Sequence, residues 1–285
     1  MKKIICIALA LVMLLSCVTL LASCGREKNG VKVIDIALSV EEYAFAVKKD
    51  DATLLGQINA YLAQIKADGT FDEICNKYFG DGTPTKFESA ALDSGKDQLV
   101  VATSTGFAPF EMVENGQYYG IDLEIAKGFA EYLGKELVIQ DMKFESVVTS
   151  VQMGTCDIGM AGLTVTPARQ QQVTFSNSYY NASQVLIVNE NDTTFDACTT
   201  ADEIVAILDT LTTDTKIGCQ TGTTGETYLV GDLDNPDGYG FKGVPATKMG
   251  YDYAALAVTA MRNGEINFVI LDNAPANTIA ASVNK

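Results

Sequence analysis

Polar and charged side chains that could bind a small molecule follow four predicted strands. In open α/β sheets, ligands bind beyond the carboxyl ends of the strands, where loops and helix N-termini present side chains and free N–H groups. The strands are expected over Leu99–Thr103, Ile158–Ala161, Lys216–Cys219 and Ile266–Leu271. The loops after them contain Ser104, Phe107, Thr164, Arg169, Gln220, Thr223, Thr224 and Asp272. These loops supply one arginine, one aspartate, several hydroxyls and an aromatic ring.

The composition excludes several kinds of chemistry. The 285 residues include no histidine and no tryptophan, which rules out Ser-His and Cys-His nucleophiles and most zinc sites. Catalysis would have to use carboxylates, Tyr, Lys or Cys. The formal net charge of -16 and the pI near 4.3 argue against nucleic acid, whose binding needs clustered Lys and Arg. We expect neither a metal nor another cofactor.

The first 23 residues have the pattern of an export signal, with two lysines before an apolar run over residues 4–21. Such a run could alternatively remain as a membrane-spanning helix. Leu21–Cys24 resembles the lipobox of bacterial lipoproteins, and Leu14–Cys17 is a weaker match. The resemblance implies cleavage before Cys24 and lipid on that cysteine. The protein would then be held at the outer face of the cell membrane, or in a periplasm, by a tether over residues 24–30.

Four further cysteines would remain in the mature chain: Cys75, Cys156, Cys198 and Cys219. Their spacing matches no metal motif. Export permits disulfides, but the sequence does not choose among the pairings. Buried free thiols are therefore the default expectation.

Strands and helices alternate from residue 98 to the end of the chain. Apolar residues recur every four positions between Ile121 and Leu133, which predicts a helix that ends at Gly134. A polar stretch after Asn189 marks a boundary, and Thr200 with Glu203 predicts a capping box before the next helix. Residues 98–285 are thus expected to form two consecutive α/β units.

The residues before this region predict a further strand and two helices. The strand is expected over Tyr43–Val47, and apolar faces predict helices around Leu55–Ile65 and Phe71–Phe79. Asp81–Gln98 contains few apolar residues and is the best candidate for a linker.

Several motifs resemble those of a known family. They are ATSTG at Ala102–Gly106, FAPFE at Phe107–Glu111, YYGIDLEIA at Tyr118–Ala126, AGLTVTPAR at Ala161–Arg169 and VTFSNSYY at Val173–Tyr180. They are similar to motifs of the family 3 solute-binding proteins, which serve polar amino acid ABC importers. The resemblance implies an α/β, type II periplasmic-binding-protein fold, in which two lobes joined by two hinge strands close on a ligand.

The resemblance also implies roles for the residues after the strands. Arg169 would bind the α-carboxylate of a free polar amino acid, since a planar guanidinium matches a carboxylate with two hydrogen bonds. Asp272 would bind the α-ammonium. Hydrogen bonds would come from Thr164 and from the backbone at Ala161 and Gly162. Phe107 and Phe144 would enclose the side chain of the ligand, and Gln220, Thr223 and Thr224 would contribute from the second lobe.

The chain departs from the family at two of these positions, because Ser104 stands where many relatives have Asp and Gln220 where some have Lys. Both differences leave the side-chain specificity open. Without the resemblance, the residues have simpler interpretations. Arg169 would be a solvated residue of a first helical turn, Asp272 an N-cap, and Phe107 and Phe144 core residues.

The order of the segments predicts a circularly permuted member of the family. The resemblance places residues 31–41 and 186–285 in lobe 2, and residues 42–80 and 98–182 in lobe 1, with 81–97 as the linker. In relatives, the segment similar to 31–80 follows the segment similar to the end of this chain. If the fold is retained, Lys285 must lie near Val31. The alternative is an independent N-terminal module, although 40 residues form a poor core.

Three functions remain open at this point. The first is a monomeric binding protein, not an enzyme, that delivers an amino acid to an ABC permease. The second is a dehydratase, since a few proteins similar to this family act on prephenate or arogenate. Its general acid would be Glu111 or Glu226, although both are better explained as surface or helix-start acids. The third is a sensing module that signals through a separate receptor.

Overall fold

Glycines and capping residues set the helix boundaries that the sequence predicts. The computed structural model describes residues 30–235 and 238–285. Helix α4 (Ile121–Leu133) ends at Gly134, whose φ of 71° lies in the left-handed region that favours glycine. Helix α7 (Ala201–Leu208) begins with the capping box of Thr200 and Glu203. Both predictions are confirmed.

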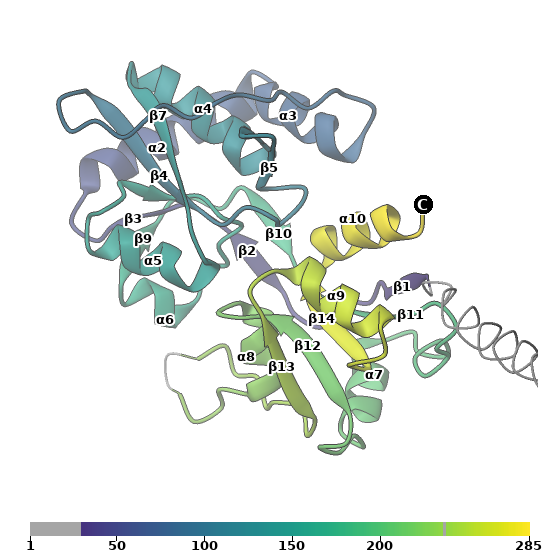
Figure 1. Ribbon diagram of the computed structural model, residues 1–285. Helices are drawn as coiled ribbons and strands as arrows, with labels where there is room; N and C mark the ends of the chain where they lie inside the picture. Colours follow the sequence, from purple (N-terminus) through teal and green to yellow (C-terminus); the bar gives the residue numbers. More distant parts are fainter. Residues whose placement is uncertain (1–29, 236–237) are drawn as a thin grey trace, which may run out of the picture.

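Two five-stranded sheets form the two lobes (Figure 1). In spatial order, the first contains β7 (Glu136–Asp141), β4 (Gln98–Thr103), β8 (Ile158–Gly159), β3 (Ala46–Lys48) and β9 (Val173–Phe175). The second contains β1 (Val31–Ile34), β11 (Gln184–Asn189), β14 (Phe268–Asp272), β12 (Lys216–Gln220) and β13 (Thr247–Tyr251). A hairpin of β5 (Met112–Glu114) and β6 (Gln117–Tyr119) extends the first lobe.

Helices cover both faces of each sheet. In the first lobe, α2 (Ala52–Ala67), α3 (Thr70–Phe79) and α4 form one layer, while α5 (Phe144–Gln152) packs on the opposite face and α6 (Pro167–Gln170) packs against β9. In the second, α9 (Ala254–Arg262) and α10 (Asn273–Val283) share one core, and α7 and α8 (Thr224–Val230) share the other. Alternate residues of β11 point into these two cores, as a strand buried on both faces requires.

Two short paired strands connect the lobes. β2 (Glu41–Tyr43) and β10 (Tyr180–Ala182) are antiparallel, and each leads from one five-stranded sheet to the other (Figure 1). The predicted strand over Tyr43–Val47 is therefore wrong. Its first part pairs with β10 between the lobes, whereas β3 pairs with β8 and β9 inside the first sheet. Two other strands differ at their ends, since β8 stops at Gly159 and β14 starts at Phe268.

The residues before 98 complete both sheets. β1 is an edge strand of the second sheet, and β3 lies between β8 and β9 in the first. The interpretation of residues 31–80 as an independent module is therefore wrong. β1 pairs with β11 and β3 pairs with β8 and β9, and all three of these partner strands lie after residue 98. The expected linker is partly docked, since Phe87 is buried and exchanges two backbone hydrogen bonds with Tyr118.

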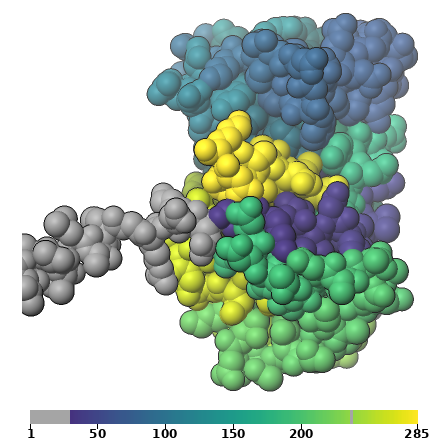
Figure 2. All heavy atoms as spheres, turned by 90° about the vertical axis from the view of Figure 1, so that its right-hand side faces the viewer, coloured from purple at the N-terminus to yellow at the C-terminus, as the bar shows by residue number. Residues whose placement is uncertain are grey.

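The end of the chain is bound to the first strand. The Asn284 side chain accepts a hydrogen bond from Val31 N at 2.9 Å and donates one to Val31 O at 2.7 Å. Figure 2 shows α10 packed beside the N-terminal strands. The proximity that the permuted order requires is therefore present.

Several expectations fall on residues 1–29, which lie outside the described residues. They are the export signal, the lipid on Cys24 and all of the tether except Gly30. Within the described ranges, no helix is long and apolar enough to span a bilayer. The four cysteines in these ranges are free thiols, with Cys156 and Cys219 buried and Cys75 and Cys198 half-buried.

We expect Asn284→Ala to lower the free energy of unfolding by about 1–2 kcal/mol, because two hydrogen bonds at a partly buried strand end are lost. The measurement is urea denaturation followed by circular dichroism. Lys285→Ala changes the neighbouring exposed residue and serves as the control. An equal shift of the midpoint in both variants would show that the bonds to Val31 do not stabilise the fold.

Candidate functional site

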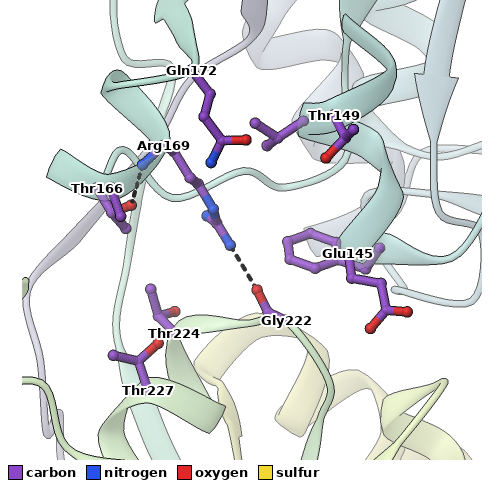
Figure 3. Close-up of a pocket in the computed structure, with 11 residues that line it drawn as sticks. Glu145, Thr149, Thr166, Arg169, Gln172, Gly222, Thr224 and Thr227 are labelled. Atoms are coloured by element: carbon purple, nitrogen blue, oxygen red, sulfur yellow. Dashed lines mark hydrogen bonds between the residues drawn. The ribbon is translucent and has the colours of Figure 1, made fainter. Parts of the chain in front are cut away.

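Arg169 reaches from the first lobe to the second. The Thr166 hydroxyl caps the short helix α6 by accepting a hydrogen bond from Arg169 N. The guanidinium then donates to Thr164 O at 2.7 Å and to Gly222 O, across the cleft, at 3.1 Å (Figure 3). It also lies over the Phe144 ring, with Cζ 5.2 Å from the ring centroid. Arg169 is thus a half-buried residue of a short helix, and its charged end is held between the lobes.

Asp272 lies at the carboxyl end of β14 and is buried. It occupies the N-cap position of α10, but its side chain makes no capping hydrogen bond. Instead it accepts a hydrogen bond from the Tyr43 hydroxyl at 2.6 Å. Burial and the nearby Glu41 raise the pKa of Asp272 to about 7. The aspartate is therefore turned toward the strands that connect the lobes.

Glu41 is a residue of this cluster that the sequence did not reveal. Its side chain is buried on β2, and its carboxylate accepts four hydrogen bonds. The hydroxyls of Thr164 and Thr224, one from each lobe, both donate to Oε2 at 2.7 Å. Ser39 and Gln184 donate to Oε1. No motif marks Glu41, because it precedes the predicted strand and its burial depends on both lobes.

The charges of this cluster act on one another. Burial lowers the pKa of the Arg169 guanidinium, while Glu41 and Asp272 oppose that change. Two carboxyl groups and one guanidinium therefore share the space where the lobes meet. The structure thus brings together four of the predicted residues, Arg169, Asp272, Thr164 and Thr224, and adds Glu41 and Tyr43.

The other predicted residues of the first lobe are in contact with residues of the same lobe. Gly162 N donates to Asp122 at 2.9 Å, so this backbone group is already used within the lobe. Ala161 is buried beside it, and Phe107 packs against Gly162, where a Cβ atom would lie 2.9 Å from the ring. Ser104 is buried, and among the described residues its hydroxyl has no hydrogen-bond partner. Phe144 contacts Arg169 itself.

Two predicted residues of the second lobe make contacts within that lobe. Thr223 is the N-cap of α8, and its hydroxyl donates to Gln220 O at 2.7 Å. The Gln220 side chain donates to Asp252 O at 3.2 Å. Their hydrogen bonds are those expected of residues that shape a loop, whereas Thr224 bonds directly to Glu41.

A cavity of 280 Å³ lies between the lobes next to Arg169 (Figure 3). Its walls come from α5, from the loop and helix around Arg169 and from the start of α8, and they include Phe144, Glu145, Thr149, Gln172, Gly222 and Thr227. The lobes touch around it, since Lys143 pairs with Asp252 at 3.1 Å. The cavity extends the candidate site toward residues that the sequence did not suggest.

The two acids considered for catalysis lie in different surroundings. Glu226 is a helix-start acid, as expected; it accepts a hydrogen bond from Gly222 N and pairs with Lys248. Glu111 was expected at the surface, and this is wrong, since it is fully buried beneath the Phe107 loop. Within the described residues, no group of acidic or cysteine side chains could hold a metal ion.

Comparisons with known proteins agree with this architecture. The arginine-binding extracellular protein ArtP of Bacillus subtilis (strain 168) is 40% identical over 99 residues, which cover 35% of this chain and 39% of ArtP. The chain therefore spans well under two thirds of that relative. The holo structure of ArgBP from T. maritima has a TM-score of 0.52 and 28% identity, covering 66% of this chain and 74% of ArgBP.

The ancestral amino acid-binding protein AncCDT-1, a precursor of cyclohexadienyl dehydratase, shares the fold, with a TM-score of 0.54 at 24% identity over 75% of this chain and 78% of that one. A family model covers residues 99–268, more than half of the chain. The resemblance seen in the sequence motifs is thereby confirmed, and the chain belongs to the bacterial extracellular solute-binding proteins, family 3.

Proposed function

We propose that this protein captures a free α-amino acid between its lobes and delivers it to the permease of an ABC importer. The observation that carries the proposal is the placement of a guanidinium and a carboxyl group where the lobes meet: the half-buried Arg169 donates across the cleft to Gly222 O, and Asp272 is buried at the end of β14. An α-amino acid is a zwitterion. Its carboxylate would pair with Arg169 and its ammonium with Asp272, so each buried charge would receive an opposite one.

Closure of the lobes on the ligand is the second part of the proposal. Thr164 and Thr224 come from different lobes and already bond to one carboxylate, that of Glu41. A ligand carboxylate in the cleft would give both lobes a common acceptor in the same way. The paired strands β2 and β10 would serve as the hinge, because they are the connections between the sheets.

We further propose a basic amino acid as the ligand. Arg169 and Asp272 balance the two backbone charges of an amino acid, and Glu41 then leaves the cleft with an additional negative charge. A cationic side chain would compensate this charge. The names of ArtP and ArgBP as arginine-binding proteins support testing arginine first.

We infer binding without catalysis. Of the two acids considered for a dehydratase, Glu111 is buried within the first lobe and Glu226 is paired with Lys248. Neither lines the cavity next to Arg169. We also propose that the protein is a monomer outside the cell membrane, held there by lipid on Cys24, and that its segments are circularly permuted.

Replacing Arg169 tests the ligand site. We expect Arg169→Ala to weaken L-arginine binding by well over tenfold, since breaking a buried charge pair costs on the order of 2 to 5 kcal/mol. Isothermal titration calorimetry measures the affinity, and Arg262→Ala, at the end of α9, is the matched control. Other polar amino acids and prephenate follow in the same assay, with product analysis for prephenate. Unchanged affinity in Arg169→Ala would remove Arg169 from the site, and turnover of prephenate would favour the enzyme.

The pKa of Asp272 predicts a pH dependence of binding. With a pKa of about 7 in the ligand-free protein, Asp272 is half protonated near neutral pH, and only its ionised form attracts an ammonium group. Ligand affinity should therefore fall below pH 7, approaching about tenfold per pH unit. Calorimetry from about pH 5 to 8 measures this. A flat affinity over that range would place the ammonium elsewhere.

The same pKa predicts the sign of a stability change. A carboxyl whose pKa is raised from 3.8 to about 7 on folding loses stability as the pH rises between these values. The ligand-free Asp272→Asn variant should therefore melt at a higher temperature than the wild type at about pH 8, although it binds ligand more weakly. Asp35→Asn, at an exposed aspartate of the second lobe, is the control. A lower melting temperature for Asp272→Asn would contradict the raised pKa.

Reordering the chain tests the permutation. A chain that runs from residue 81 to 285 and continues with 31–80 should fold and bind ligand within a few-fold of the original, because Asn284 and Val31 are already in contact. Residues 98–285 alone should not fold, since both sheets lose a strand. Circular dichroism and calorimetry measure both. A stable, ligand-binding 98–285 fragment would refute the proposal.

A further inference from the structure

Two carboxyl groups, those of Glu111 and Asp122, are neighbours in the interior of the first lobe: Asp122 N donates to the carbonyl of Phe110, next to Glu111, and the two carboxyl groups act on each other as hydrogen-bond partners. Both residues have no exposed surface. Asp122 is in the first turn of α4, and Glu111 follows Phe110 in the loop after β4. Neither forms an ion pair among the described residues. A buried carboxylate without a counter-charge is costly, and two adjacent ones more so.

The hydrogen-bond donors around the pair all donate to Asp122. Gly162 N donates to Asp122 Oδ2 at 2.9 Å, and the Tyr179 hydroxyl donates to Oδ1 at 2.5 Å. Within the described part of the chain, both oxygens of Glu111 lack any donor. Asp122 is therefore suited to remain ionised, and the neighbour to which Glu111 can bond is Asp122 itself, provided that Glu111 carries a proton.

The other titratable groups near the pair offer no compensating positive charge. Asp272 at the end of β14 and Asp141 at the end of β7 raise the pKa of Glu111, and Cys75 on α3 raises the pKa of Tyr179. All of these groups are acids. Burial and then Asp122 raise the pKa of Glu111 well above its ordinary value, in agreement with the geometry.

The pair also connects the two loops that form the first lobe's side of the cleft. The Glu111 backbone exchanges two hydrogen bonds with Phe107, each at 3.1 Å. Asp122 holds Gly162, on which Phe107 packs, and Tyr179, which precedes β10. A hydrogen bond between the two carboxyl groups would therefore fix the Phe107 loop, the Gly162 loop and the approach to the hinge strand relative to one another.

We propose that Glu111 and Asp122 share one proton at neutral pH, and that this carboxyl pair makes Glu111 a positioning residue for the cleft wall formed by Phe107 and Gly162. The shared proton is independent of ligand. The role in positioning the cleft wall rests on the proposed function, because it matters for binding only if an amino acid occupies the cleft.

Infrared spectroscopy of the ligand-free full chain detects the proton directly. The spectra are recorded at about pH 7, where ordinary carboxyl groups are ionised, and every protein compared also carries Asp272→Asn, so a remaining carbonyl band of a protonated carboxylic acid belongs to the pair. We expect this band in the Asp272→Asn protein and in the control Glu88→Gln, an exposed glutamate of the same lobe, and its loss in Glu111→Gln. Absence of the band from the Asp272→Asn protein, or its persistence in Glu111→Gln, would overturn the proposal.

Thermal melting against pH tests the consequence for stability. A raised pKa in the folded state contributes stability that is lost as the pH rises through it. The melting temperature of the wild type and of Glu88→Gln should therefore fall more steeply as the pH rises above about 5 than that of Glu111→Gln, whose amide donates to Asp122 without titrating. Parallel profiles for the three proteins would contradict a shared proton.

Measurements of ligand affinity test whether Glu111 positions the cleft wall through its hydrogen bond or only fills space in the core. Glu111→Leu keeps the volume but has no donor, so we expect its affinity for L-arginine to fall by about tenfold, the effect of one lost bond to a charged group. Glu111→Gln should restore it. Equal affinities in the two variants would refute the positioning role. If L-arginine does not bind even the wild type, hydrogen exchange of the Gly162 amide is measured in place of the affinity. Faster exchange in Glu111→Leu than in Glu111→Gln would support the positioning role, and equal exchange rates would refute the role.

Discussion

Charged groups buried between the two lobes have to be compensated, and much of the arrangement follows from this requirement. Arg169, Glu41 and Asp272 come from the first lobe, the connecting strand β2 and the second lobe. Each takes hydrogen-bond partners from outside its own element: Arg169 from Gly222, Glu41 from Thr164 and Thr224, and Asp272 from Tyr43. The lobes and their connection are thus bound through polar groups, which water or a ligand can replace more easily than an apolar core.

The surroundings of three buried carboxyl groups differ in the number of donors that they supply. Glu41 accepts four hydrogen bonds from side chains of both lobes. Asp272 accepts one from Tyr43, and its pKa rises to about 7. Glu111 has no donor among the described residues, and burial raises its pKa well above the ordinary value. The same chemical group is therefore suited to three tasks, because donors stabilise the ionised form and burial without donors favours the protonated one.

The path of the chain explains how residues far apart in the sequence reach one site. β2 and β10 are the crossings between the sheets, and two residues of β2, Glu41 and Tyr43, contact both lobes. The segment before residue 98 supplies one crossing and a strand of each sheet. Two hydrogen bonds between Asn284 and Val31 join the end of α10 to the edge strand β1 of the second sheet. The order of the segments can change without altering these contacts, because the ends already meet.

The sequence by itself determined the family, the α/β class and the loops from which the cleft is built. Apolar periodicity and capping residues such as Gly134 and Thr200 act over a few neighbouring residues, so they can be read without a fold. The positions of Arg169, Asp272, Thr164 and Thr224 followed from motifs carried by such loops. The same reasoning joined Tyr43, the last residue of β2, to β3 in one strand, because Tyr43–Val47 is a run of aromatic and aliphatic residues and the different pairing partners lie over 100 residues away.

Only the tertiary structure decided which of the acidic residues are buried and what they bond to. Glu41 and Glu42 are adjacent in the sequence, yet one is buried between the lobes and the other is exposed. Glu111 was expected at the surface and lies in the core, beside Asp122. Burial of a charged group depends on donors and neighbours brought from distant segments, and its protonation depends on them in turn. The residues next to a carboxyl group in the sequence do not indicate which distant residues will surround it. The role of the carboxyl group is therefore set when the chain folds.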